Sequence, residues 1–183
     1  MTETLTHKIT LTVNGVERRL SVESRTLLID ALRTQLGLVG AHDGCSHGVC
    51  GACTVLIDGE TARACLTLAV QVDGARIDTI EGLAIDGKLD PIQEAFWRRH
   101  GLQCGFCTPG MVLLAGEFLK QNPNPTREEA RDAMSSNLCR CTGYQHIIDS
   151  VMEAASRLRG EEWSAEAAIP PGELREKTGV IGG

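Results

Sequence analysis

Apolar and polar residues alternate near the start of the chain. Between residues 8 and 22, apolar side chains recur mostly at every second position, on both sides of Asn14-Gly15. Alternation is typical of half-buried strands, and Asn-Gly between two such runs favours a tight hairpin turn. The apolar spacing then changes to three and four residues, which predicts a helix over 27–36 with Gly37 as its C-terminal cap.

Short apolar runs further along predict more strands, at 54–57, 64–70 and 76–80. The segment 37–51 is rich in glycine, which indicates a loop rather than regular structure. A hairpin, a helix, a long loop and further strands together predict a small mixed sheet with one packed helix.

After about residue 83 the pattern becomes helical, and the chain carries four helix-start signals. They lie at residues 90–93, 108–109, 126–129 and 142–145. The first, third and fourth are interpreted as capping boxes, in which side chains bind the free backbone groups of the first turn. Short connections between four helices indicate an all-α four-helix bundle. The predicted fold class is therefore α+β.

Two domains and a tail follow from these patterns. The first spans 1–84, and the helical domain spans 85–159. Residues 160–183 carry five Glu together with Pro170-Pro171, which predicts a flexible tail.

Composition narrows the functional classes. The 183-residue chain has a formal net charge of −6 and no dense basic run, which disfavours nucleic-acid binding. No apolar run approaches the roughly 20 residues that span a bilayer. The N-terminus lacks the charged and apolar regions of a secretory signal, so a cytoplasmic location is expected.

Eight cysteines are many for such a chain. A reducing cytoplasm keeps thiols unpaired, so metal binding is the first interpretation. Cys45, Cys50 and Cys53 have the spacing C-x4-C-x2-C of plant-type [2Fe–2S] proteins, and Cys65 supplies a fourth thiol. Glycines between them let the chain wrap closely around a cluster. Zinc is the alternative, but it favours paired C-x2-C knuckles.

A second group consists of Cys104 and Cys107 (C-x2-C) with Cys139 and Cys141 (C-x-C). Each pair stands just before a predicted helix start, where the partial positive charge of a helix N-terminus suits an anionic centre. This spacing alone fits either zinc or a second [2Fe–2S] cluster. The first motif nearby favours the cluster.

The segments 44–54, 103–111 and 137–144 together resemble one family, the small iron–sulfur subunits of molybdenum hydroxylases in the xanthine oxidase group. The likeness is to the bacterial three-subunit type. It implies a β-grasp, plant-ferredoxin-like N-terminal domain and a four-helix C-terminal domain, each with one [2Fe–2S] cluster. It also implies a large subunit with molybdopterin in its cytosine dinucleotide form and a medium FAD subunit, in an (αβγ)2 hetero-oligomer.

In such an enzyme this chain would relay electrons from the molybdopterin centre to FAD while an N-heteroaromatic or aldehyde-type substrate is hydroxylated. The resemblance places Gln103 and Cys141 near the molybdopterin of the partner. Gln103 could instead be a loop amide with no ligand. The chain has no catalytic constellation of its own. The alternatives are a free-standing ferredoxin-type electron carrier and a zinc-stabilised interaction module.

Overall fold

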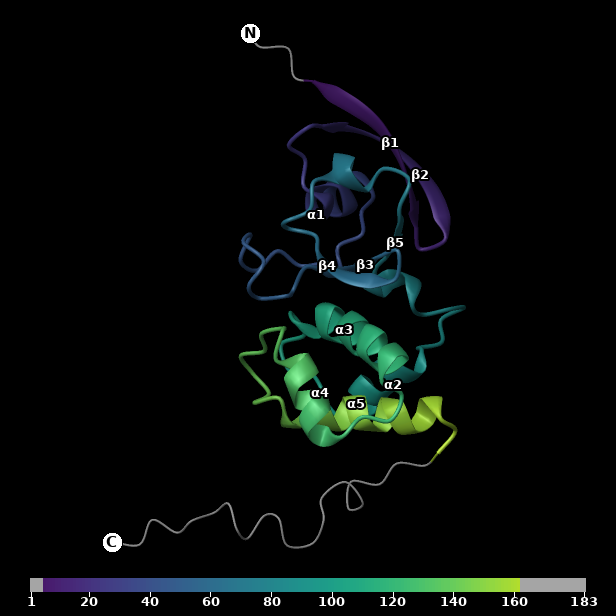
Figure 1. The fold of residues 1–183 in the computed structure, drawn as a ribbon, viewed down its shortest axis with the longest axis vertical. Coiled ribbons are helices and arrows are strands. Elements are labelled where there is room, and N and C mark those ends of the chain that lie inside the picture. The colour runs from purple at the N-terminus through teal and green to yellow at the C-terminus, as the bar shows by residue number, and fades with distance from the viewer. Residues whose placement is uncertain (1–4, 162–183) are drawn as a thin grey trace, which may run out of the picture.

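A five-stranded mixed sheet forms the first half of the protein in a computed structural model that describes residues 5–161 (Figure 1). Its strands are β1 (Thr6–Val13), β2 (Val16–Glu23), β3 (Thr54–Ile57), β4 (Glu60–Arg63) and β5 (Arg76–Asp78). They lie in the order β2-β1-β5-β3-β4. β1 and β2 form the predicted hairpin around Asn14-Gly15, and β5 pairs parallel with β1.

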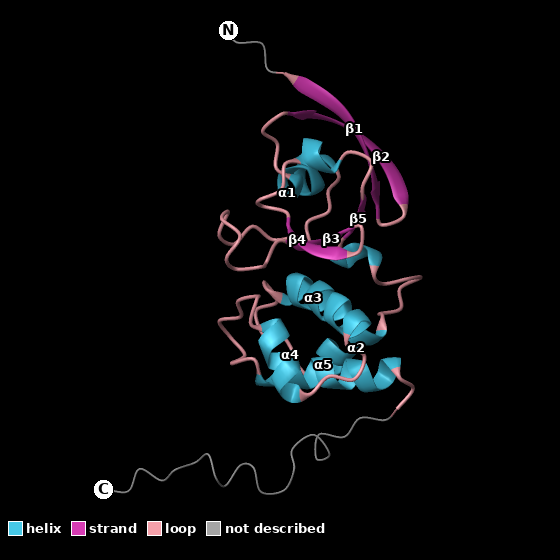
Figure 2. Ribbon diagram, in the orientation of Figure 1, coloured by secondary structure: helices cyan, strands magenta, loops and turns pink. Residues whose placement is uncertain are grey.

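The predicted helix over 27–36 packs against this sheet (Figure 2). It comprises α1 (Leu28–Asp30) and a wider π-helical turn (Ala31–Gln35). Leu28 and Leu32 are fully buried in a core with strand residues of alternating position, as the apolar pattern requires. The core members from the strands are Ile9, Leu11, Val13, Leu20, Val22, Val55 and Ile77.

The strand predicted at 64–70 is wrong. β4 ends at Arg63, and a short 3-10 helix covers Ala69–Val72. The carbonyls of this segment bind α1 instead of a neighbouring strand: the Leu28 amide donates to Thr67 O at 2.7 Å and the Ile29 amide to Ala64 O at 3.1 Å. A short buried apolar run does not reveal which partner takes its hydrogen bonds. The last predicted strand, 76–80, is also shorter than expected, because a 3-10 turn occupies Ile80–Gly82.

Four helices follow in the second half of the described chain (Figure 2). They are α2 (Pro91–Arg98), α3 (Thr108–Gln121), α4 (Arg127–Met134) and α5 (Gln145–Leu158). They enclose a core of their own around Phe96, Met111 and Ile147, separate from the core of the sheet. α3 lies between the sheet and the other helices and contacts β3 (Figure 1). None of the helices within residues 5–161 has the length and apolar character to cross a membrane.

Two of the three predicted capping boxes are confirmed. Asp90 accepts the Gln93 amide at 2.7 Å, and Thr126 pairs in the same way with Glu129. The box predicted at 142–145 is wrong, because Tyr144, with a φ of 68°, is the N-cap of α5. The Thr142 hydroxyl lies 3.2 Å from Cys139 Sγ instead. All of the predicted tail after residue 161 lies outside the described residues.

Replacing Thr126 with Ala should destabilise the protein by about 1 kcal/mol, because the first turn of α4 loses its side-chain acceptor. The backbone N–H of Thr126 donates to the Glu129 carboxylate and lowers the pKa of Glu129. The contribution of this hydrogen bond to stability is therefore present at neutral pH and is lost as the pH falls through that lowered pKa. Chemical denaturation at pH 7 measures the loss. Thr126→Ser keeps a hydroxyl and should retain wild-type stability; equal losses in both variants would contradict the assignment.

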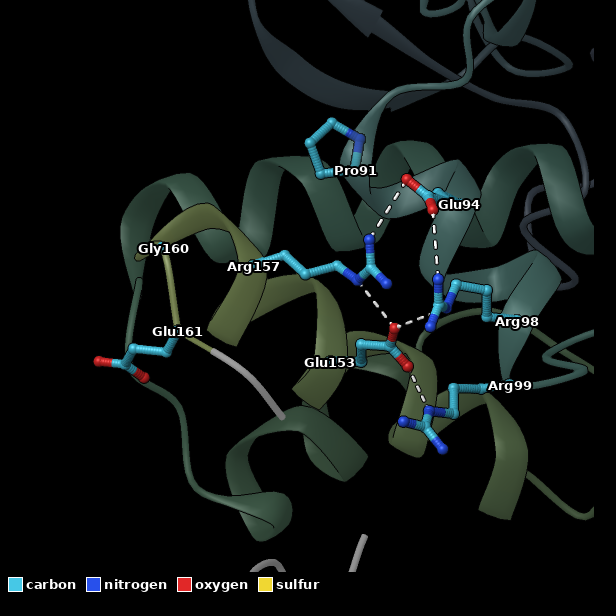
Figure 3. A pocket seen from close by; sticks show the side chains of 8 residues that line it. All are labelled: Pro91, Glu94, Arg98, Arg99, Glu153, Arg157, Gly160 and Glu161. Atoms are coloured by element: carbon cyan, nitrogen blue, oxygen red, sulfur yellow. Dashed lines mark hydrogen bonds and ion pairs between the residues drawn. The ribbon is translucent and has the colours of Figure 1, made fainter. Parts of the chain in front are cut away.

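A polar cavity of about 530 Å³ lies between α2 and α5 (Figure 3). Glu153, whose side chain is only 3% exposed, accepts from Arg157 Nε at 2.8 Å, from Arg99 Nε, and pairs with Arg98 at 3.5 Å. Glu94 bridges Arg157 and Arg98 from the more exposed side. No cysteine lines this cavity, so it is a structural ion-pair network between two helices rather than part of the candidate site.

Candidate metal centres

The first cysteine set consists of Cys45, Cys50, Cys53 and Cys65. The first three lie on the loop that leads into β3, and Cys65 lies in the turn after β4. The Sγ atoms of Cys53 and Cys65 are 3.3 Å apart and buried, and the Cys50 amide lies 3.4 Å from Cys45 Sγ. The structure thus brings these thiols together in two pairs.

The backbone conformation of this loop explains why glycines occur beside and between its cysteines. Gly48 and Gly51 have φ values of 81° and 72°, a region that favours glycine. A Cβ on Gly44 would stand 3.2 Å from Cys50 Sγ, so the backbone there runs close to the sulfur. Tight turns of this kind aim backbone N–H groups at thiolates and stabilise their negative charge. His47 is exposed on the same loop, as expected.

The pKa values of Cys45 and Cys65, both in the first cysteine set, differ sharply. The Cys50 amide, with help from that of His47, lowers the pKa of Cys45 to about 6. Burial, with the neighbouring Cys53 thiol, raises the pKa of Cys65 to about 11. A thiol must lose its proton to ligate metal, so metal binding at Cys65 releases a proton that the free thiol would hold at neutral pH.

The second cysteine set consists of Cys104, Cys107, Cys139 and Cys141. Cys107 and Cys139 are buried and interact, and burial raises the pKa of Cys107 to about 12. Cys104 and Cys141 are exposed, and the Phe106 backbone N–H together with the neighbouring Cys141 thiol lowers the pKa of Cys104. Two loops far apart in sequence, before α3 and before α5, therefore meet here. Gln103 is exposed beside Cys104.

The donor chemistry fits two iron–sulfur clusters. Zinc and iron–sulfur clusters both take thiolate ligands, and the two centres differ in how the thiols are grouped. Each set presents two thiol pairs, which matches a [2Fe–2S] cluster with two thiolates on each iron. Tetrahedral zinc would gather all four thiols around a single ion. When bound, such a cluster accepts and releases one electron.

The two cysteine sets adjoin each other through residues 136–138. The Leu138 amide donates to Cys50 O at 2.8 Å, and Arg63 donates to Ser136 O at 2.9 Å. His42 stacks on Phe106 with ring centroids 4.6 Å apart. The sequence does not predict these contacts. The one hint is that Phe106 and residues 137–138 lie inside the segments that carry the cysteines.

Comparisons with known proteins agree with this geometry. Residues 11–79 match the family described as "2Fe-2S iron-sulfur cluster binding domain", and residues 79–152 match "[2Fe-2S] binding domain". The chain is 53% identical over 151 residues to the nicotine 6-hydroxylase small subunit of Paenarthrobacter nicotinovorans, covering 82% of this chain and 91% of that one.

Two solved structures are similar to the protein. Quinoline 2-oxidoreductase from Pseudomonas putida 86 has a chain that is 51% identical, with a TM-score of 0.82; the match covers 86% of this chain and 99% of that one. Aldehyde oxidoreductase from Desulfovibrio desulfuricans is 46% identical with a TM-score of 0.81; the match covers 85% of this chain and 17% of that one.

Fold, thiol pairs and matches define an iron–sulfur electron-transfer protein that is part of an oxidoreductase. The chain belongs to the family of small iron–sulfur subunits of molybdenum hydroxylases.

Proposed function

We propose that this chain relays electrons from a molybdopterin cytosine dinucleotide centre in a large subunit to FAD in a medium subunit. The substrate would be an N-heteroaromatic compound or an aldehyde. The names of the similar proteins support this range, since they act on nicotine, quinoline and aldehydes. The assembly would be an (αβγ)2 hetero-oligomer in the cytoplasm, where reducing conditions keep the thiols free for metal.

In this proposal the first cysteine set holds one [2Fe–2S] cluster and the second set holds the other. Two separate cores support two domains, for which we propose 1–84 as the ferredoxin-like domain and 85–159 as a four-helix bundle; Ile80 and Leu83, just before this boundary, already pack against the helical core. Each domain would support one centre.

The observation that carries the proposal is the asymmetry of the second set. One thiol pair, Cys107 and Cys139, is buried, whereas Cys104 and Cys141 are exposed beside the exposed Gln103. An exposed edge of this kind is open to a cofactor on a partner chain. Gln103 and Cys141 are the residues that we propose lie near the molybdopterin.

Anaerobic purification of the tagged chain from its native source tests the proposal. We expect it to co-purify with one chain that contains molybdenum and another that contains flavin. Adding a panel of N-heteroaromatics and aldehydes to this complex should bleach the iron–sulfur absorption with at least one compound. A chain that runs alone with full iron would instead be a free-standing electron carrier, and the relay would be wrong.

A further inference from the structure

Gly51, Gly110 and Asn137 come into contact where the two cysteine sets adjoin. Gly51 belongs to the loop of the first set. Gly110 lies in the first turn of α3, directly after the C-x2-C motif of the second set. Asn137 precedes Cys139 by two residues. These positions join the loops of both sets at one point.

The contact among these residues has no spare volume. A Cβ on Gly51 would overlap the Asn137 side-chain amide and stand 3.1 Å from Asn137 Cα. A Cβ on Gly110 would overlap the Gly51 carbonyl oxygen and stand 3.3 Å from Asn137 Nδ2. Glycine is therefore required at both positions by close approach, and the Asn137 side chain fills the remaining gap.

Asn137 is held firmly in that gap. It is 1% exposed, its backbone amide donates to Met134 O at 3.2 Å, and its carbonyl accepts from Tyr144 Oη at 2.8 Å. Its Nδ2 donates to Thr54 Oγ1 at 3.4 Å, while Oδ1 has no hydrogen-bond partner within residues 5–161. A buried amide oxygen without a partner costs stability, so stability alone does not account for Asn at this position.

The chain around Asn137 follows the first loop closely. The hydrogen bonds from Leu138 to Cys50 O and from Arg63 to Ser136 O clamp both of its neighbours to the first half of the protein. Two residues after Asn137, Cys139 is the first cysteine of the C-x-C pair in the second cysteine set. A change in the volume at Asn137 must therefore shift one set relative to the other, because packed interiors transmit such strain.

We propose that Asn137 is a positioning residue, whose side chain between Gly51 and Gly110 sets the spacing of the two cysteine sets and of the clusters that they hold. This inference rests on the proposed function, because it requires two clusters. Two reduced [2Fe–2S] clusters are paramagnetic, and the dipolar interaction between them falls with the cube of their separation. The spacing is therefore measurable as a splitting in the EPR spectrum, independently of activity.

Gly110→Ala in the full, iron-loaded complex is the first test. We expect full iron content with a narrowed EPR splitting, since the new methyl group pushes α3 away from the Gly51 carbonyl. Gly116→Ala is the matched control on the same helix, because its Cβ would meet only Ile92 Cδ1 at an ordinary 3.5 Å. It should leave the splitting unchanged. An unchanged splitting in Gly110→Ala overturns the inference.

Asn137→Ala is the second test and does not depend on how the glycine variant folds. This variant should keep both clusters and change the EPR splitting. Without the Asn137 side chain, the distance between Gly51 and Gly110 is free to change. Iron-loaded Asn137→Ala with the wild-type splitting contradicts the positioning role. Loss of iron from both variants contradicts it too, because the contact would then serve cluster assembly. A wild-type protein with fewer than two clusters would refute the proposed function itself.

Discussion

Cys53→Ser should lose one of the two iron clusters and keep the other. Cys53 is 1% exposed, and its sulfur is 3.3 Å from that of Cys65, so no water or nearby side chain can readily replace it as a ligand. A serine hydroxyl does not ionise at neutral pH and is a poor ligand for this iron. Iron content should fall from about four to about two per chain, since each [2Fe–2S] cluster carries two.

Cys107→Ser is the reciprocal variant. It belongs to the second cysteine set and to the helical core, so it should remove the other cluster and leave the first. Iron analysis and EPR of the dithionite-reduced proteins distinguish the two outcomes, because each variant should retain a different signal. Ser46→Ala, on the first loop but without a thiol, is the control and should retain both signals. If both cysteine variants lost the same signal, the assignment of two independent thiol sets would fail.

Glu153→Gln should lower the thermal unfolding temperature by roughly 6–12 °C, from a loss of about 3 kcal/mol. The buried carboxylate of Glu153 compensates three arginines, and the neutral amide would leave their charges facing one another between α2 and α5. This loss lies at the low end for a broken buried ion pair, because Arg98 is half exposed. Loss of helical circular dichroism on anaerobic heating measures the effect.

Glu94→Gln is the matched control for that experiment. Glu94 pairs with two of the same arginines, but its side chain is 43% exposed, so solvent screens the interaction. Its loss should cost less than about 1 kcal/mol and lower the unfolding temperature by no more than about 4 °C. Equal effects at Glu94 and Glu153 would show that burial does not control this network.

Local signals in the sequence predict much of the fold. The hairpin at Asn14-Gly15 and the caps at Asp90 and Thr126 are confirmed, because each depends on residues within a few positions of one another. The strand expected at 64–70 is wrong, because α1 takes the hydrogen bonds of that segment. The cap expected at Thr142 is wrong for a local reason, since its hydroxyl contacts Cys139 three residues earlier and Tyr144 is the N-cap of α5.

The grouping of the eight cysteines into two sets is predictable from spacing, but the pairing of the thiols within each set is not. Cys53 with Cys65, and Cys104 with Cys141, come together only through the packing of separate segments. The burial of Glu153 is not predictable from the sequence either, because a glutamate on an amphipathic helix is usually exposed. Asn137 lies in the segment 137–144 that carries the family resemblance, yet its burial against Gly51 depends on both halves of the protein.

We propose above that two thiol sets in one polypeptide each hold a [2Fe–2S] cluster. Quantification of metal and acid-labile sulfide in the anaerobically purified protein, with EPR after reduction, tests it most directly. We expect about four iron and four sulfide per chain and two distinct EPR signals. Zinc in either set, or about two iron with a single signal, would contradict it.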